Sequence, residues 1–252
     1  MKNDHSESSR AAVVVELWCS AEPAELDAEL AQRYEALLST DEKVRWQRFR
    51  QADDRRRFLL TRALLRTVLG DHRGQAPHEL EFTVDRWGKP QLVSMPEGEE
   101  PLHFNLSHTD GMVVLAVSRQ AEVGVDVEDE RRDVQAEALT LRYFAEEELR
   151  ALRALPPEER QPHFLRLWTL KEAYVKALGL GLRIPLDSFA FALSEREIAF
   201  QRREGQGANT SMCFRSLVLP PRHRVGLAVA TDAELAVRLY QGQPLVGFER
   251  TA

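Results

Sequence analysis

Two acidic residues near the middle of the chain have the spacing that divalent-metal chemistry uses. In residues 123–128 (Val-Gly-Val-Asp-Val-Glu) a strand would place Asp126 and Glu128 on one face, because side chains alternate along a strand. At a separation of ~6 Å and an effective dielectric of about 20, their repulsion costs about 3 kcal/mol before solvent screening. A magnesium ion would reverse that cost, since one or two carboxylates typically hold it together with phosphate oxygens and water. The alternative is a strand end that runs into solvent, because Asp129 and Glu130 continue the acidic run.

A third acid belongs to a helical pattern further along the chain. Trp168, Glu172 and Lys176 are spaced four residues apart and therefore share one helix face. A Glu and a Lys four residues apart are also a common surface pair, worth about 0.2–0.5 kcal/mol. The large aromatic side chain at the head of the stripe indicates that this face is covered, and covered charges need a partner such as a metal or a phosphate. Both interpretations stay open at this point.

Residues 104–111 (Phe-Asn-Leu-Ser-His-Thr-Asp-Gly) combine an apolar start with a polar, turn-forming end. Ser107 and His108 could be read as a serine nucleophile and its base. Adjacent side chains in an extended segment point apart, however, and Ser107 lacks the surrounding Gly-x-Ser-x-Gly elbow. The segment is better explained as a backbone turn that aims a hydroxyl and an imidazole at a phosphate.

Basic residues are concentrated between positions 43 and 66, where nine Lys or Arg side chains accompany only Asp53 and Asp54. Arginine forks suit phosphate or carboxylate groups. Most such runs are solvated helix faces, so we expect one or two of these side chains to contact a ligand. The sequence has neither a Gly-x-x-x-x-Gly-Lys-Ser/Thr loop nor a dinucleotide-binding Gly-x-Gly-x-x-Gly motif between a strand and a helix.

The composition narrows the class of protein. The 252 residues carry 34 Lys and Arg against 40 Asp and Glu, a net charge of −6, which argues against a general nucleic-acid binder. Cys19 and Cys213 are too few for a disulfide framework or a zinc site, so a reducing compartment fits best. No run approaches the length of a signal-peptide core or a spanning helix. We expect a cytoplasmic protein whose residues 1–10 form a flexible N-terminus.

Residue patterns predict an α+β fold with antiparallel strands. Helical periodicity covers residues 23–38, 41–69 (one helix or two in series), 134–155 and 163–178. Strand patterns cover residues 11–18, 79–84, 113–118, 123–128, 189–193, 214–219 and 225–230. Residues 86–90 read as a turn, and Gly179 and Gly181 end the last long helix.

A weak internal repeat suggests that the chain contains two related halves. Residues 60–70 resemble 168–179, and 114–117 resemble 226–229, at offsets of 108 and 112 positions (169 − 61 and 227 − 115). We therefore expect two similar α+β halves, at 11–121 and 122–252, related by a pseudo-twofold axis. Each half would have an antiparallel sheet and a long helix. A cleft between two packed halves is a usual place for a ligand.

The order of these motifs resembles the 4′-phosphopantetheinyl transferases, in particular the long, monomeric type associated with surfactin-like synthases. The resemblance rests on residues 104–109, 123–128 and 168–176 with the trailing Gly179-x-Gly181. It implies transfer of the 4′-phosphopantetheine arm of coenzyme A to a serine of an apo carrier protein (acyl, peptidyl or aryl). Adenosine 3′,5′-bisphosphate would be the second product. The implied partners are coenzyme A and the carrier, with neither nucleic acid nor membrane.

The resemblance also implies roles for individual residues. Mg²⁺, or alternatively Mn²⁺, would be held by Asp126, Glu128 and Glu172. Glu172 would also act as the base that activates the carrier serine, directly or through a metal-bound water, with Glu148 behind it.

The remaining implied roles concern coenzyme A. Lys176 would contact phosphate oxygens and take part in catalysis. His108 and Arg57 would hold the 3′-phosphate, and Lys89 and Ser107 would complete the contacts.

Three departures accompany the resemblance. Ala145 stands where family members often have a Ser or Thr helix cap, worth about 1 kcal/mol, and Leu180 replaces a frequent lysine. In the first copy of the repeated helix, Leu65 falls where we expect the counterpart of Glu172, so one catalytic set is predicted. The alternative functions are an inactive scaffold that binds coenzyme A or carriers, and a hydrolase of the coenzyme A pyrophosphate.

Overall fold

The computed structural model describes residues 11–84, 89–93, 98, 100–132, 134–179, 184–202 and 210–251. The predicted flexible terminus 1–10, the turn residues 86–88, and Leu180 and Gly181 lie outside the described residues. Within that part of the chain the fold is α+β with several antiparallel sheets, as predicted. No helix among the described residues is both long and apolar enough to span a membrane.

The first segment begins with a strand, continues with helices and ends with a series of strands. Its elements are β1 (Val13–Ala21), α1 (Ala28–Leu37), α2 (Thr40–Gln47), α3 (Ala52–Arg73), the 3₁₀ turn η1 (Pro77–Glu79), β2 (Phe82–Val84), β3 (Pro90–Leu92), β4 (His103–Thr109) and β5 (Met112–Ser118). The predicted helix 41–69 is thus two helices. Ser39 and Glu42 cap the start of α2 reciprocally, which fixes where that helix begins.

The second segment repeats this order of elements. It comprises β6 (Val123–Asp129), α4 (Ala136–Tyr143), α5 (Glu146–Ala154), α6 (Pro157–Leu178), the 3₁₀ turn η3 (Leu186–Ser188), β7 (Phe189–Leu193), β8 (Ile198–Arg202), β9 (Cys213–Leu219) and β10 (His223–Val229). Two further strands, β11 (Leu235–Gln243) and β12 (Gly247–Arg250), follow it. The side-chain cap expected to be missing at Ala145 is indeed absent from α5.

Strand pairing repeats as well. In the first segment β5 lies antiparallel between β1 and β4, and in the second β10 lies antiparallel between β6 and β9. The hairpins β2–β3 and β7–β8 also correspond. This order and pairing support a duplicated unit, while the pseudo-twofold axis itself stays a prediction. β11 pairs in parallel with β1, so the final strands complete a five-stranded sheet built mostly from the first segment.

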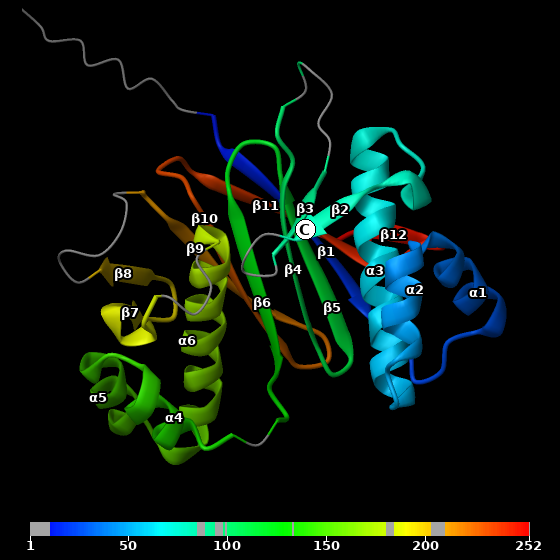
Figure 1. Cartoon of the computed structure of the whole chain (residues 1–252). Helices are drawn as coiled ribbons and strands as arrows, with labels where there is room; N and C mark the ends of the chain where they lie inside the picture. The colour runs from blue at the N-terminus through cyan, green and yellow to red at the C-terminus, as the bar shows by residue number, and fades with distance from the viewer. Residues whose placement is uncertain are drawn as a thin grey trace, which may run out of the picture.

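Four layers result from these pairings, with the strands between helices on both sides (Figure 1). One apolar cluster joins α1 and α3 to one face of the five-stranded sheet through residues such as Leu64 and Leu115. A second fills the space between the two sheets and includes Val15 and Val125. A third joins α6 to the outer face of the three-stranded sheet, where Ala228 lies. Each long helix is therefore held by its own sheet.

Two glycines let α6 lie directly on its sheet. A Cβ atom at Gly124 of β6 would be 2.0 Å from the carbonyl oxygen of Ala173 and 2.4 Å from the amide nitrogen of Ala177. A Cβ atom at Gly226 of β10 would be 2.4 Å from the carbonyl oxygen of Thr169. These neighbours are backbone atoms, which cannot move aside as a flexible side chain can. This close contact therefore fixes the positions of Glu172 and Lys176 relative to the sheet.

We expect Gly124→Ala to lower the free energy of unfolding by about 3 kcal/mol or more, because the added methyl overlaps helix backbone. Urea denaturation followed by circular dichroism measures the change. Gly74→Ala is the control: this glycine has a φ of 59° and no atom near the added Cβ, so only about 1 kcal/mol of backbone strain is expected. Equal losses in the two variants would contradict the close helix contact.

Candidate active site

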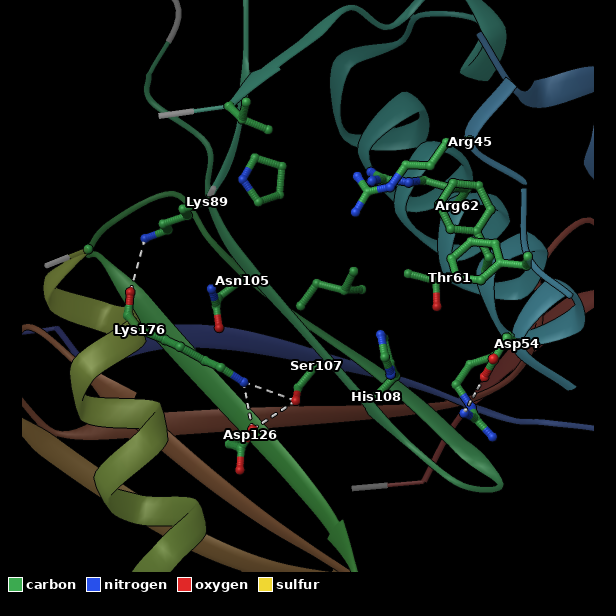
Figure 2. Close-up of a pocket in the computed structure, with 17 residues that line it drawn as sticks. Arg45, Asp54, Thr61, Arg62, Lys89, Asn105, Ser107, His108, Asp126 and Lys176 are labelled. Atoms are coloured by element: carbon green, nitrogen blue, oxygen red, sulfur yellow. Dashed lines mark hydrogen bonds and ion pairs between the residues drawn. The ribbon is translucent and has the colours of Figure 1, made fainter. Parts of the chain in front are cut away.

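A cavity of about 660 Å³ lies between α6 and the helices of the first segment. Figure 2 shows Asp126, Ser107 and Lys176 at one end and Arg45, Arg62 and Thr61 at the other. Its floor is the seam where β4 of one sheet meets β6 of the other. The predicted cleft between two units is therefore present, and it contains most of the predicted site residues.

Side chains close this seam. The Oδ1 atom of Asn105, on β4, accepts a hydrogen bond from the backbone N–H of Val125, on β6, at 2.9 Å. Two residues further along β4, the Ser107 hydroxyl donates to Oδ1 of Asp126 at 2.9 Å. Strand alternation places Asn105 and Ser107 on the same face, so both side chains point across the seam toward β6.

Lys176 of α6 completes a compact polar group with these residues. Its Nζ lies 2.6 Å from Oδ1 of Asp126, 3.0 Å from Oγ of Ser107 and 3.2 Å from the carbonyl oxygen of Val125. These three acceptors match the three protons of an ammonium group. The structure thus brings together the predicted residues Asp126, Lys176 and Ser107.

The other two predicted metal ligands lie close enough to Asp126 to feel its charge. Burial and then the neighbouring Asp126 raise the pKa of Glu172, an effect that Lys176 opposes. Burial and Asp126 likewise raise the pKa of Glu128, whose carboxylate accepts a 3.4 Å hydrogen bond from Arg132. Among the described residues, no three Asp, Glu, His or Cys side chains already form a closed ligand cluster. The three acids are thus near enough to influence one another's pKa, but in the described structure they do not form a ligand cluster.

Electrostatics and hydrogen bonding show that these residues fit a divalent cation. Oδ2 of Asp126 is buried and has no hydrogen-bond partner in the described structure. Glu172 likewise shows neither a hydrogen bond nor an ion pair within the described residues. Partly buried carboxylate oxygens without donors are the ligand type that Mg²⁺ and Mn²⁺ prefer.

The predicted phosphate-binding pair lines the cavity beyond Ser107. The His108 ring keeps access to solvent. Its partial desolvation by the surrounding protein lowers its pKa, and the positive charges of Arg57 and Lys176 lower it further. The Arg57 guanidinium is bonded to carboxylates of Glu22 at 3.0 Å and Asp110 at 2.6 Å. An incoming phosphate would therefore exchange with these carboxylates.

Lys89 reaches the same end of the cavity as Lys176. Its Nζ lies 3.3 Å from Oε2 of Glu122 and 3.4 Å from the backbone carbonyl of Lys176 (Figure 2). Lys89 is thus held at the C-terminal end of α6, beside the backbone of Lys176.

Three lining residues were not singled out from the sequence. Arg45 and Arg62 belong to the basic run, and Thr61 is adjacent to Arg62. Oγ1 of Thr61 is buried without a hydrogen bond, whereas Nε of Arg62 is buried 3.5 Å from Oε1 of Glu42, in an ion pair. Burial lowers the pKa of Arg62, an effect that Glu42 opposes. The signal that could have identified two of them is the spacing of Phe58, Thr61 and Arg62, which places all three on one helix face.

Glu148 is not part of this site, which corrects the predicted catalytic role. Its side chain is fully buried, with Oε2 at 2.8 Å from Nζ of Lys171. The same oxygen accepts from the N–H of Ala145, and Oε1 accepts from the N–H of Phe191. Because protein donors use both oxygens, Glu148 has none to offer to a substrate or a metal in the cavity. Its function in this structure is to join α5, α6 and β7.

The first segment contains the same buried ion pair. Glu42, at the third position of α2, binds Arg66 of α3 at 2.8 Å, just as Glu148, at the third position of α5, binds Lys171 of α6. Further bonds from each cation reach carbonyl oxygens at both ends of the following 3₁₀ turn. The acceptors are Pro77 and Leu80 for Arg66, and Leu186 and Phe189 for Lys171.

These contacts correct the alignment of the repeat. If Arg66 corresponds to Lys171, the residue that matches Glu172 is Thr67 rather than Leu65. In either alignment, the first segment has no glutamate at the position that corresponds to Glu172.

We expect Lys171→Met to lower the free energy of unfolding by about 3–5 kcal/mol, because it leaves the buried Glu148 carboxylate without its counterion. Glu148→Gln and the double variant complete a mutant cycle measured by urea denaturation. The double variant should lose less than the sum of the two single losses. Additive losses would show that the two side chains do not stabilise each other.

Comparison with known proteins agrees with this geometry. The sequence profile of the 4′-phosphopantetheinyl transferase superfamily matches residues 122–230, and that of the 4′-phosphopantetheinyl transferase N-terminal region matches residues 23–120. The chain is 37% identical to 4′-phosphopantetheinyl transferase HetI of Nostoc sp. (strain PCC 7120), over 77% of this chain and 78% of that protein.

Two further proteins show the range of similarity. The chain is 30% identical to 4′-phosphopantetheinyl transferase Sfp of Bacillus subtilis (strain 168), over 68% of this chain and 73% of that protein. The crystal structure of Thermotoga maritima holo-[acyl-carrier-protein] synthase overlaps with a TM-score of 0.36 at 20% identity, over 53% of this chain and 84% of the other. From the two profiles and the identity to HetI and Sfp, the chain belongs to the 4′-phosphopantetheinyl transferase superfamily of enzymes.

Proposed function

We propose that this enzyme transfers the 4′-phosphopantetheine arm of coenzyme A to a serine of an apo acyl, peptidyl or aryl carrier protein, releasing adenosine 3′,5′-bisphosphate. One observation carries the proposal: a single cavity joins the acid–ammonium group at Asp126 and Lys176 to a cationic end at Arg45 and Arg62. A nucleotide with a pyrophosphate and a separate 3′-phosphate has charges in two places, which matches this layout. We further propose that the enzyme is cytoplasmic and monomeric.

Asp126, Glu128 and Glu172 would hold the metal ion, with Mg²⁺ as the first candidate and Mn²⁺ as the second. The ion would neutralise charge that develops on the pyrophosphate. The unpartnered Oδ2 of Asp126 supports this assignment. Burial, and then repulsion from Asp126, raise the pKa values of Glu128 and Glu172, and a bound cation would offset both effects by favouring the ionised carboxylates.

In the reaction, Glu172 would accept a proton and Lys176 would stabilise negative charge. The serine hydroxyl of the carrier attacks the phosphorus that bears the pantetheine arm, and its proton passes to Glu172. The bond from that phosphorus to adenosine bisphosphate breaks, and the Lys176 ammonium stabilises the charge on the departing phosphate. Proton transfer to a positioned side chain typically contributes about 10²–10⁴-fold to the rate.

The opposite end of the cavity would bind the nucleotide. His108 and Arg57 are our candidates for the 3′-phosphate, and Arg62, which is paired with Glu42 at 3.5 Å, adds positive charge on the same side. Lys89 is positioned for the pyrophosphate beside Lys176. The sequence also predicted that Ser107 contacts coenzyme A, but we do not assign it that role, because its hydroxyl donates to Oδ1 of Asp126 at 2.9 Å.

We expect Glu172→Gln to abolish transfer while the protein stays folded, because the amide cannot accept the serine proton. The assay mixes enzyme, coenzyme A, Mg²⁺ and an apo carrier, and mass spectrometry detects the phosphopantetheine added to the carrier. Omission of the metal, with EDTA present, should also stop the reaction.

The same assay distinguishes the alternative functions. Free phosphopantetheine would indicate a hydrolase, and no change in either coenzyme A or the carrier would indicate an inactive scaffold. A Glu172→Gln variant whose kcat is within threefold of the wild-type value would refute the role of Glu172.

We expect His108→Ala to raise the KM for coenzyme A by about tenfold, while the KM for 3′-dephospho-coenzyme A changes less than twofold. The loss of one charge-assisted hydrogen bond to phosphate is worth about 1.5–3 kcal/mol, which sets this magnitude. Steady-state kinetics with both substrates measures it. If both KM values rise equally, His108 does not recognise the 3′-phosphate.

A further inference from the structure

The two oxygens of the Asp126 carboxylate have different surroundings. Oδ1 accepts hydrogen bonds from Oγ of Ser107 at 2.9 Å and from Nζ of Lys176 at 2.6 Å. Oδ2 is buried and has no partner. Both protein donors therefore bind the same oxygen of this carboxylate. Oδ1 is held in place, and Oδ2 is available to bind a ligand.

Ser107 is placed to hold this arrangement from the opposite sheet. It is 8% exposed and lies on β4, whereas Asp126 is 7% exposed and lies on β6. Rotation of the carboxylate would break the Ser107 bond, and no other serine or threonine hydroxyl within the described residues contacts Oδ1. The neighbouring Asn105–Val125 bond fixes the offset of the two strands, so the hydroxyl stays opposite Asp126.

Lys176 cannot supply the same restraint throughout the reaction that we assign to this enzyme. Its side chain is 28% exposed and is held by three acceptors at the cavity wall. When the ammonium turns toward a phosphate oxygen, its bond to Oδ1 weakens. The hydroxyl of Ser107 then remains as the neutral donor on that oxygen.

We propose that Ser107 is a positioning residue for a metal ligand: it anchors Oδ1 of Asp126 so that Oδ2 is presented to the divalent cation. This inference rests on the proposed metal site and changes the role that the sequence predicted for Ser107, from a contact with coenzyme A to a support for Asp126. Hydrogen bonds that orient a ligating carboxylate are part of a metal site, and their removal typically lowers metal affinity roughly 10–100-fold.

The experiment measures metal binding and coenzyme A binding separately. Mn²⁺ binding is followed by electron paramagnetic resonance of the free ion, without coenzyme A. Coenzyme A binding is followed by calorimetry in EDTA. We expect Ser107→Ala to weaken Mn²⁺ binding at least about tenfold and to change the Kd for coenzyme A less than twofold. Ser107→Thr keeps a hydroxyl and should restore most of the Mn²⁺ affinity.

Thr109→Val is the matched control, because Thr109 lies on the same face of β4 and no bond joins it to Asp126 in the described structure. Circular dichroism checks that each variant is folded. The proposal is overturned if Ser107→Ala binds Mn²⁺ as the wild type does, or if its main loss is in coenzyme A binding. Failure of the proposed function looks different, since wild-type protein would then neither bind Mn²⁺ nor modify the carrier.

Discussion

The direct contact between α6 and its sheet is the constraint on which the site depends. At Gly124 and Gly226 the helix backbone takes the space that side chains would otherwise fill, so α6 cannot slide or rotate without a steric clash. Lys176 is thereby held against Asp126, and Glu172 lies close enough to the same acid for its charge to raise the Glu172 pKa. The geometry of the charged groups is therefore set mainly by packing, and their electrostatic energies follow from it.

The two halves show how a duplicated unit can carry one site. Both keep the ion pair that ties the middle helix of the segment to its long helix, Glu42–Arg66 and Glu148–Lys171. Such a pair leaves little room for change, because either charge alone would be buried without compensation. Where the second copy has Glu172, the first has Thr67, whose hydroxyl is buried without a partner. The shared pair maintains the fold, and the proposed catalytic groups occur in one copy.

Strand and helix periodicity could predict only which acids and lysine share a face, whereas the expected roles of Arg57, Lys89 and His108 came from the family resemblance. Asp126 and Lys176 could be placed that way, and the cleft followed from the repeat. Glu148 could not: a glutamate three residues into a helix gives no sign that Lys171 will be buried against it. Arg62 is one of nine basic residues in its run, and the helix face that it shares with Phe58 was the sequence signal that could have distinguished it. The parallel contact of β11 with β1 joins the two ends of the chain, and no local pattern encodes it.

Internal counterions at both ends of the cavity shape how it can bind a charged substrate. Arg57 is already bonded to Glu22 and Asp110, and Lys176 to Asp126. A phosphate that binds either cation replaces an existing ion pair, so the gain in free energy is the difference between two interactions. A ligand with one phosphate gains at one end only, whereas a ligand that reaches both ends gains twice within one binding event. Under the proposed function, selectivity for a nucleotide with separated phosphates would arise from this exchange. A metal ion held by Asp126 would favour the exchange by competing with Lys176 for the carboxylate.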